Sequence, residues 1–147
     1  MTPITDDGQK ITQLVLKVFQ LNGQFLSVAE KIAAPAGLTA ARWQVLGAVL
    51  REPKTVSNIA HDMGLARQSV QRLANILIDE GQAEYRDNPS HKRAKLLAIT
   101  TRGQASIERL GNDQHTWANA LAAAVDPADL ESCLGVLSCL SDHLDSN

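Results

Sequence analysis

Residues 55–81 read TVSNIAHDMGLARQSVQRLANILIDEG, and their spacing of small and apolar side chains is typical of a helix-turn-helix. The small Ala60 lets two helices cross closely, Gly64 turns the chain between them, and the β-branched Val70 fills the corner. The surrounding apolar frame consists of Ile59, Met63, Leu65 and Leu73. This pattern predicts that the polar outer face of the second helix enters a DNA major groove, so it indicates sequence-specific DNA binding rather than catalysis.

Composition and charge support a globular chain with one DNA-facing segment. The 147 residues suit one domain or two small lobes, and 44% hydrophobic and 20% charged residues make disorder improbable. The net charge of −2 hides an asymmetry: residues 65–102 carry seven Lys/Arg and four Asp/Glu, whereas residues 103–147 carry one and seven. A basic middle segment beside an acidic one is typical of a DNA-binding surface on a neutral body.

The sequence predicts no signal peptide, no membrane span and no disulfide framework. The start, MTPITDDGQK, is acidic and polar, unlike a signal peptide, and no apolar run approaches the roughly 18 residues of a membrane span. Two cysteines do not make a disulfide framework. We therefore expect a cytoplasmic protein.

Helical periodicity predicts two helices before the helix-turn-helix. Apolar residues recur at helical spacing over residues 7–33, and Pro35 and Gly37 end that helix. A second helix begins after the cap residue Thr39 and ends before Pro53. Its expected buried face consists of Trp43, Leu46, Val49 and Leu50.

Further elements follow from caps and alternation. Thr55 caps the third helix, and the fourth covers residues 66–80 with Gly81 as its stop. Residues 83–86 and 94–100 predict two strands around a DNPSHKR loop. A fifth helix runs from Thr101 to about residue 125, and Asp126-Pro127 begins a sixth. The apolar stripe of the sixth helix is Leu130, Cys133, Leu134, Leu137, Leu140 and Leu144.

The first and last helices carry apolar stripes longer than a DNA-binding lobe of about 65 residues can cover. Exposed apolar surface costs roughly 25 cal/mol per Å². The same helices of a second chain would cover it, which favours a two-fold homodimer over packing of the helices within one chain.

Taken together, this chain resembles the MarR family of winged helix-turn-helix regulators. The resemblance is carried by GLTAARWQVL (37–46), by the helix-turn-helix, and by the wing NPSHKRAKLLAITTRG (88–103). It implies a mainly α fold with a small β-hairpin wing. Residues 7–36 and 103–147 would form the dimerisation helices, and residues 38–102 the DNA-binding lobe.

The wing departs from the family pattern at three positions. His91 stands where the family most often has an aspartate, Asn88 replaces another acid, and Ile99 replaces the usual leucine. In the family that this chain resembles, the aspartate is expected to hold the wing arginine, and the resemblance makes Arg93 that arginine here. His91 could replace it as an acceptor when neutral, or could add positive charge toward phosphates when protonated.

Candidate DNA-reading residues lie on the exposed face of the fourth helix, since Val70, Leu73 and Leu77 form its core face. Glutamine pairs with adenine N6 and N7, and arginine with guanine O6 and N7. The candidates are Arg67, Gln68, Ser69, Gln71, Arg72 and Asn75. The alternative is a solvated polar helix face.

Candidate backbone contacts lie in the wing and before the third helix. A basic hairpin tip suits phosphates or the narrow minor groove, and the resemblance places Arg93 in that groove. The wing candidates are Arg86, His91, Lys92, Arg93 and Lys95. Thr55 and Ser57 are candidates for phosphate contacts, although capping alone would also explain them.

Other chemistry finds little support in the sequence. Cys133 and Cys139 are expected to be small packing residues, with a cross-dimer disulfide or thiol switch as the alternative. A zinc site at Cys139, His143 and His115 would need a further converging ligand set, so no metal or cofactor is expected. No phosphate loop, nucleophile elbow or Cys-x-x-Cys occurs, so we do not expect an enzyme.

The resemblance also implies regulation by a small aromatic or phenolic molecule. The amphipathic side chains expected near its crevice are Phe25, Trp43, His115 and Trp117, with core packing as the alternative for each. The predicted function is a ligand-responsive transcriptional regulator, by resemblance a repressor, that binds an inverted-repeat operator as a homodimer. The alternatives are a winged-helix module that binds protein, or a zinc- or redox-responsive regulator of the same fold.

Overall fold

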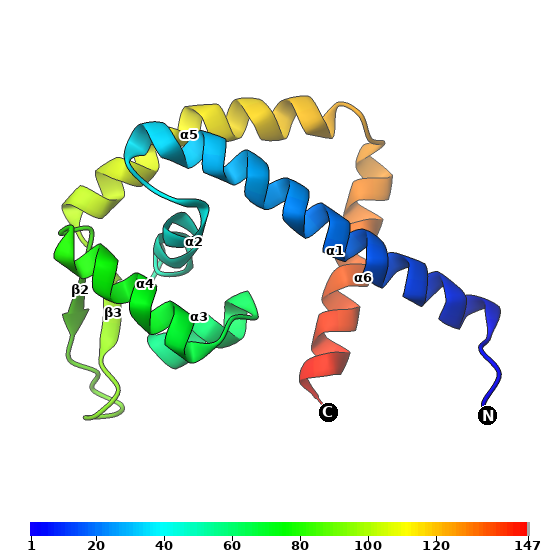
Figure 1. Cartoon of the computed structure of the whole chain (residues 1–147), viewed down its shortest axis with the longest axis horizontal. Coiled ribbons are helices and arrows are strands. Elements are labelled where there is room, and N and C mark those ends of the chain that lie inside the picture. Colours follow the sequence, from blue (N-terminus) through cyan, green and yellow to red (C-terminus); the bar gives the residue numbers. More distant parts are fainter. Residues whose placement is uncertain (147) are drawn as a thin grey trace. The chain divides into compact units, whose positions relative to one another are not determined.

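The computed structural model describes residues 1–146, which form mostly helices and one small antiparallel sheet (Figure 1). Two units are distinguished, Met1–Leu110 and a second that begins at Gly111. The elements in chain order are α1 (Asp6–Ala33), η1 (Ala34–Ala36), α2 (Ala40–Ala48), β1 (Lys54–Thr55), α3 (Val56–Met63), α4 (Arg67–Asp79), β2 (Ala83–Arg86), β3 (Leu96–Ile99), α5 (Thr101–Ala122) and α6 (Pro127–Asp145).

The predicted helix starts are confirmed, because the expected cap residues accept backbone hydrogen bonds. Thr39 Oγ1 accepts the N–H of Arg42 at 3.2 Å, and Thr55 Oγ1 accepts the N–H of Asn58 at 3.1 Å. Asp126 caps α6 in the same way. α5 ends at Ala122, three residues before the expected end, because turns at residues 123–125 close the helix.

The helix-turn-helix is confirmed. Gly64 adopts φ +64°, a left-handed conformation that favours glycine, and the chain turns there between α3 and α4. Ala60 and Val70 are buried at the crossing. Leu65, expected in the apolar frame, is 39% exposed, because it lies in the turn that follows Gly64 rather than on a helix face.

The sheet has the order β1-β3-β2 and contains one strand that the sequence did not predict. β1 pairs Lys54 with Leu97, and its two residues are too short to show an alternating pattern. On the other side of β3, Tyr85 pairs with Leu97 and Arg86 with Leu96. Neighbouring side chains of a strand point to opposite faces, so Tyr85 shares a face with the buried Ala83, and Arg86 does not.

The core lies between α2, α3, α4 and the sheet. Its largest fully buried side chains are Leu46, Ile59, Leu77, Leu97, Val45, Val49 and Val70. The expected face of α2 is correct for Leu46 and Val49 and wrong for Leu50, which is 39% exposed. The helix ends at Ala48, so residue 50 no longer follows the helical period, and Val45 is buried instead.

Gln82 joins three elements. Its N–H donates to the carbonyl of Leu77 at the end of α4, and its carbonyl accepts the N–H of Thr100. Its buried side chain donates to Ser106 Oγ of α5 at 3.1 Å. A methyl group at Gly103 would lie 2.1 Å from the Gln82 carbonyl oxygen, so only glycine lets α5 approach this closely.

The long helices bury little of their apolar surface within the chain. Ala33 is the buried residue of α1, and no residue of α6 within Pro127–Asp145 is buried. The apolar residues of α1 that are at least one-third exposed are Ile11, Val15, Leu16, Val18, Phe19, Leu21 and Phe25. None of the helices within residues 1–146 has the length and apolarity that a membrane span requires.

Both cysteines are exposed in this chain, contrary to the expectation that they fill space in a packed interior. The reason is that α6 buries none of its own residues within the chain.

Candidate nucleic-acid interface

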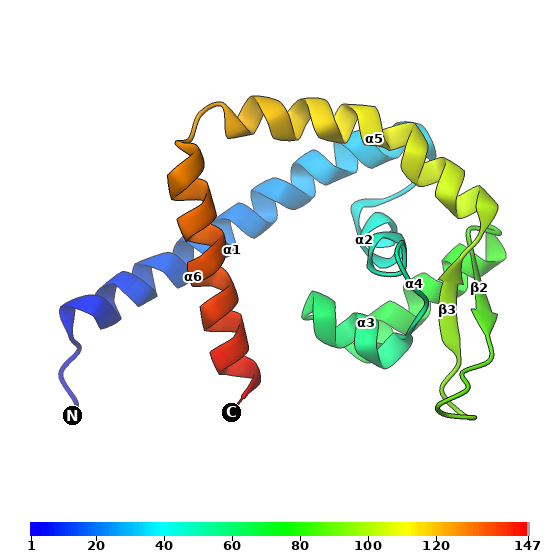
Figure 2. The same ribbon diagram turned by 180° about the vertical axis from the view of Figure 1, so that it is seen from behind.

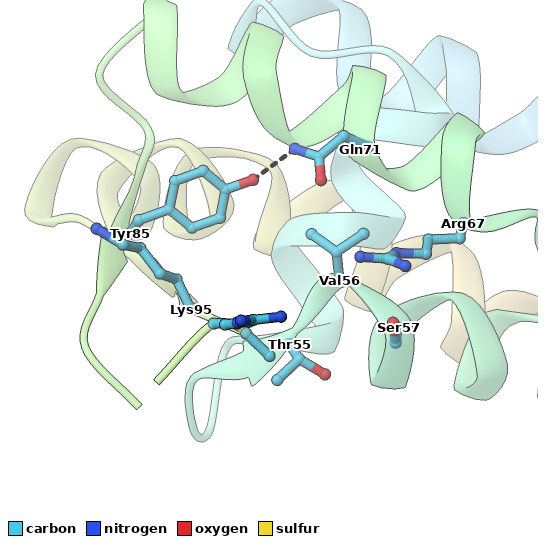
Figure 3. Close-up of a pocket in the computed structure, with 9 residues that line it drawn as sticks. Thr55, Val56, Ser57, Arg67, Gln71, Tyr85 and Lys95 are labelled. Carbon is cyan, nitrogen blue, oxygen red and sulfur yellow. Dashed lines mark hydrogen bonds between the residues drawn. The ribbon is translucent and has the colours of Figure 1, made fainter. Parts of the chain in front are cut away.

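A hollow of about 310 Å³ opens where the start of α3, the first turns of α4 and the hairpin meet (Figure 3). Figures 1 and 2 show the hairpin strands β2 and β3 beside α4 from opposite sides. We call this site the basic hollow. Its lining residues are Thr55, Val56, Ser57, Arg67, Gln71, Tyr85, Arg93, Ala94 and Lys95.

The charge of the basic hollow is positive. Arg67 comes from α4, and Arg93 and Lys95 come from the segment that leads into β3. None of the nine lining residues is acidic, so no lining carboxylate offsets these cations. A concave surface lined by one sign of charge concentrates field lines and attracts the opposite charge, which here means anions such as phosphates.

Gln71 lies at the centre of a short polar network. Its Nε2 donates to Tyr85 Oη at 2.6 Å and to Asn75 Oδ1 at 3.1 Å (Figure 3). The network joins the exposed face of α4 to β2. Tyr85 was not among the predicted site residues. The signal that could have found it is the alternation of β2, which puts residue 85 on the face of the buried Ala83.

The wing tip is held by its own hydrogen bonds. Asn88 Oδ1 accepts the N–H of Ser90 at 3.0 Å, and the Asn88 carbonyl accepts the N–H of His91 at 3.2 Å. His91 Nδ1 in turn accepts the N–H of Ala94 at 3.1 Å. His91 therefore acts as an acceptor that fixes the backbone beside Arg93, and this requires its neutral form.

Arg86 lies apart from the basic hollow. Its Nε and Nη2 donate to Glu84 Oε1 at 3.1 and 3.0 Å, and strand alternation turns it away from Tyr85. It lines a separate, smaller pocket of about 170 Å³ with Ala98 and Ile99. The paired carboxylate offsets its charge, so Arg86 is the wing cation least suited to contact DNA.

The structure sorts the predicted DNA-contact residues into groups. Those that line the basic hollow are Thr55, Ser57, Arg67, Gln71, Arg93 and Lys95. Asn75 is linked to it through Gln71. Gln68 and Arg72 are exposed on α4, Ser69 is half-buried there, and His91 and Lys92 are exposed at the wing. The hydroxyl of Thr55 accepts the N–H of Asn58 as the cap of α3 and keeps its own proton to donate, and Ser57 is exposed.

An ion pair holds the start of the sheet to α3. Lys54 Nζ donates to Asp62 Oδ2 at 3.1 Å, and His61 Nδ1 lies 3.6 Å from Asp62 Oδ1. The hydrogen bond from Lys54, followed by the contact with His61, lowers the pKa of the Asp62 carboxyl below its ordinary value of 3.8. The contact fixes β1, and with it the start of α3, beside the basic hollow.

The predicted effector residues lie in both units. Phe25 is 46% exposed and Trp43 packs partly buried against the core of the first unit, while His115 and Trp117 belong to the second. Their role stays a prediction. Within residues 1–146, no three His, Cys, Asp or Glu side chains converge as metal ligands, so the alternative zinc site gains no geometric support.

The chain is similar in sequence to known proteins. A family model described as "MarR family" matches residues 36–94. An uncharacterized protein of Mycobacterium tuberculosis (strain H37Rv) is 41% identical over 125 residues, which are 85% of this chain and 87% of that protein.

Two solved structures show the same fold at low identity. The first is a MarR family transcriptional regulator from Silicibacter pomeroyi, with a TM-score of 0.83 and 18% identity, covering 100% of this chain and 99% of that one. The second is CouR from Rhodococcus jostii RHA1 bound to p-coumaroyl-CoA, with a TM-score of 0.78 and 18% identity, covering 87% and 91%.

Proposed function

Since this chain belongs to the MarR family, whose members are transcription regulators and not enzymes, we propose that it represses transcription by binding an inverted-repeat operator as a homodimer. We further propose that a small aromatic ligand releases it from that operator. DNA binding through a winged helix-turn-helix is the shared property of the family. The operator, the dimer and the ligand are the parts that the following observations support.

The observation that carries the proposal is the basic hollow. α4 offers Arg67 and Gln71 near its N-terminal end, and a recognition helix enters the major groove with that end first. Arg93 and Lys95 lie on the hairpin beside it, where they would reach the backbone or the adjacent minor groove. Ser57 at the start of α3 would add a phosphate contact. One concave surface thus combines base-reading and phosphate-binding side chains.

The dimer is supported by the apolar surface of the long helices. In α1, Leu16 is 63% and Phe19 is 69% exposed, and in α6, Leu134 is 60% exposed. Burying such surface gains roughly 25 cal/mol per Å², and a second copy offers the same apolar stripes. Two recognition helices would then meet half-sites about 10 base pairs apart, which requires an inverted repeat.

The ligand response is supported by likeness alone. CouR holds p-coumaroyl-CoA, and this chain has four amphipathic or aromatic side chains on its long helices and α2: Phe25, Trp43, His115 and Trp117. A ligand that weakens DNA binding must itself bind the DNA complex less well. The ligand class we propose is a small molecule with an aromatic or phenolic ring.

The test is a binding titration of the full chain on DNA from the upstream region of its own gene and on random DNA. We expect tight, salt-dependent binding to one inverted repeat. Arg67→Ala should weaken specific binding by about 1–3 kcal/mol, since it removes a base-reading or phosphate contact. Arg109→Ala is the matched control, because Arg109 is exposed on α5 outside the basic hollow.

Three outcomes would contradict the proposal. Equal affinity for all sequences would contradict the proposed operator. A monomer that binds a half-site as tightly as the full site would contradict the proposed dimer. Absence of DNA binding would favour the alternative, a winged-helix module that binds protein. Sedimentation or light scattering of the free protein gives the oligomeric state independently of DNA.

A further inference from the structure

We propose that Tyr85 sets the polarity with which Gln71 reads DNA, so that Gln71 presents its carbonyl oxygen and selects a base with an exocyclic amino group. This inference rests on the proposed function, since it concerns which base the recognition helix prefers. It adds a specificity-determining residue from the hairpin to the polar face of α4.

The first step is that the amide donors of Gln71 are already engaged. A glutamine amide has two N–H donors and one carbonyl acceptor. Nε2 of Gln71 donates to Tyr85 Oη at 2.6 Å and to Asn75 Oδ1 at 3.1 Å, so both donors have acceptors inside the protein. Among the hydrogen bonds of residues 1–146, none ends on Gln71 Oε1, and Gln71 lines the open basic hollow. The atom left for DNA is the oxygen.

The second step is what an acceptor can recognise in the major groove. A free glutamine pairs with adenine through both groups, donating to N7 and accepting from N6. A glutamine with only its oxygen available accepts from the amino group of adenine N6 or cytosine N4. Guanine O6 and thymine O4 are acceptors and would face the oxygen with no proton between them. Gln71 therefore discriminates amino-bearing bases from keto-bearing ones.

The third step is why Tyr85 matters more than Asn75. Asn75 lies one turn along the same helix, where a polar pair is an ordinary surface contact. Tyr85 comes from β2, and its shorter bond fixes Gln71 against a second element. Tyr85 is 37% exposed and shares the face of the buried Ala83, so strand packing orients its hydroxyl toward α4 (Figure 3). The hydroxyl accepts from Gln71 and keeps its own proton to donate to a phosphate oxygen.

The experiment selects binding sites from a random double-stranded library with the full-length protein and its variants. The native protein should prefer adenine or cytosine over guanine and thymine at one position in each half-site, by roughly 2- to 13-fold, as expected for one hydrogen bond. Tyr85→Phe removes only the hydroxyl, frees one Gln71 donor, and should reduce this discrimination several-fold while other positions keep theirs. Gln71→Ala should abolish it, and adding Tyr85→Phe to Gln71→Ala should change nothing more at that position.

A second variant tests whether Gln71 reads the base with its carbonyl oxygen or with its N–H groups. Gln71→Glu has only acceptors, so it should retain the preference for amino-bearing bases even though its negative charge weakens all DNA binding. Loss of that preference in Gln71→Glu would overturn the inference, because it would show that Gln71 reads with its N–H groups. Gln44→Ala, on the exposed side of α2, is the control whose selected sites should match the native ones.

The failures are distinguishable. An unchanged base preference in Tyr85→Phe, or a uniform loss of affinity at all sequences, would overturn this inference and leave the proposed function standing. A native protein without any sequence preference would overturn both. Thermal unfolding of each variant accompanies the selection, and Tyr85→Phe should unfold close to the native temperature because Tyr85 is partly exposed.

Discussion

Arg42 Nη1 lies 2.6 Å from Glu80 Oε1, and this ion pair joins α2 to the residue that ends α4. Arg42 Nε also donates to Thr39 Oγ1 at 3.3 Å, and Glu30 Oε1 of α1 accepts the N–H of Ala40 at 2.9 Å. α1 therefore holds the start of α2, and α2 holds the end of α4. The direction of the recognition helix depends on a polar chain that begins in α1.

Arg42→Ala should lower the free energy of unfolding by about 1 kcal/mol or somewhat more. The substitution removes a largely buried cation, and the half-exposed carboxylate of Glu80 then has lost its partner. Urea unfolding measures the change. Arg51→Ala, at an exposed arginine, is the control and should change stability by less than about 0.5 kcal/mol. If Arg42→Ala and Glu80→Ala are additive in a double-mutant cycle, the pair does not couple α2 to α4.

Gly103→Ala should destabilise the fold by about 1–3 kcal/mol or more, because the new methyl would lie 2.1 Å from the Gln82 carbonyl oxygen and 2.8 Å from Ile99 Cγ1. The same change at Gly111, on the same helix, meets no atom within 4 Å and should stabilise by up to about 1 kcal/mol through helix propensity. Thermal melts of the two variants should therefore shift in opposite directions. A shift in the same direction would contradict the close approach of α5 to Gln82.

The Lys54–Asp62 contact should make stability depend on acid pH. Since the folded pKa of Asp62 is lowered, its contribution is present above the ordinary value of 3.8 and is lost as the pH falls through the folded pKa. Asp62→Asn removes this proton linkage, so its stability should fall less steeply than that of the native protein below about pH 4. Denaturant titrations at pH 7 and in the acid range compare the two slopes. Parallel slopes would show that the contact does not persist in solution.

His91→Leu should loosen the wing, because it removes the acceptor of the Ala94 N–H. Amide hydrogen exchange at Ala94 should speed up, and DNA binding should weaken because ordering the wing then adds to the cost of association. His91→Asn keeps a side-chain acceptor and should behave more like the native protein. The stability of the core should not change in either variant, since His91 is exposed. Equal exchange rates at Ala94 in all three proteins would contradict the role of His91 in ordering the wing.

The helices and the winged fold could be predicted because their signals are local. Cap residues, Gly64 and the apolar period each act within a few neighbouring positions. The helices predicted from these signals are confirmed. The two-residue strand β1 could not be predicted, since its pairing with β3 spans about forty residues of chain. Leu50 was misplaced because the end of α2 at Ala48 depends on how the following turn packs.

The binding surface was predicted as residue types but not as an arrangement. Their residue types predict Arg67, Gln71, Arg93 and Lys95 as DNA-contact residues, and the fold brings these four to one hollow. That Tyr85 would meet Gln71 depends on the register of β2 against β3, which one sequence does not specify. Arg86 lies on the other face of β2 from Tyr85, and the alternation of side chains along the strand could have indicated this from the sequence.

The bonds of Gln82 have a consequence for how this protein measures DNA. Gln82 is bonded to Leu77 in the last turn of α4, to Thr100 directly after β3 and to Ser106 in α5, so one residue ties the helix and the hairpin together. If α4 lies in the major groove and the wing in the minor groove, the affinity depends on the groove width and twist of the duplex between them. Operators would then differ in affinity through base pairs that no side chain touches. The bonds of Gln82 would in this way make binding sensitive to DNA shape.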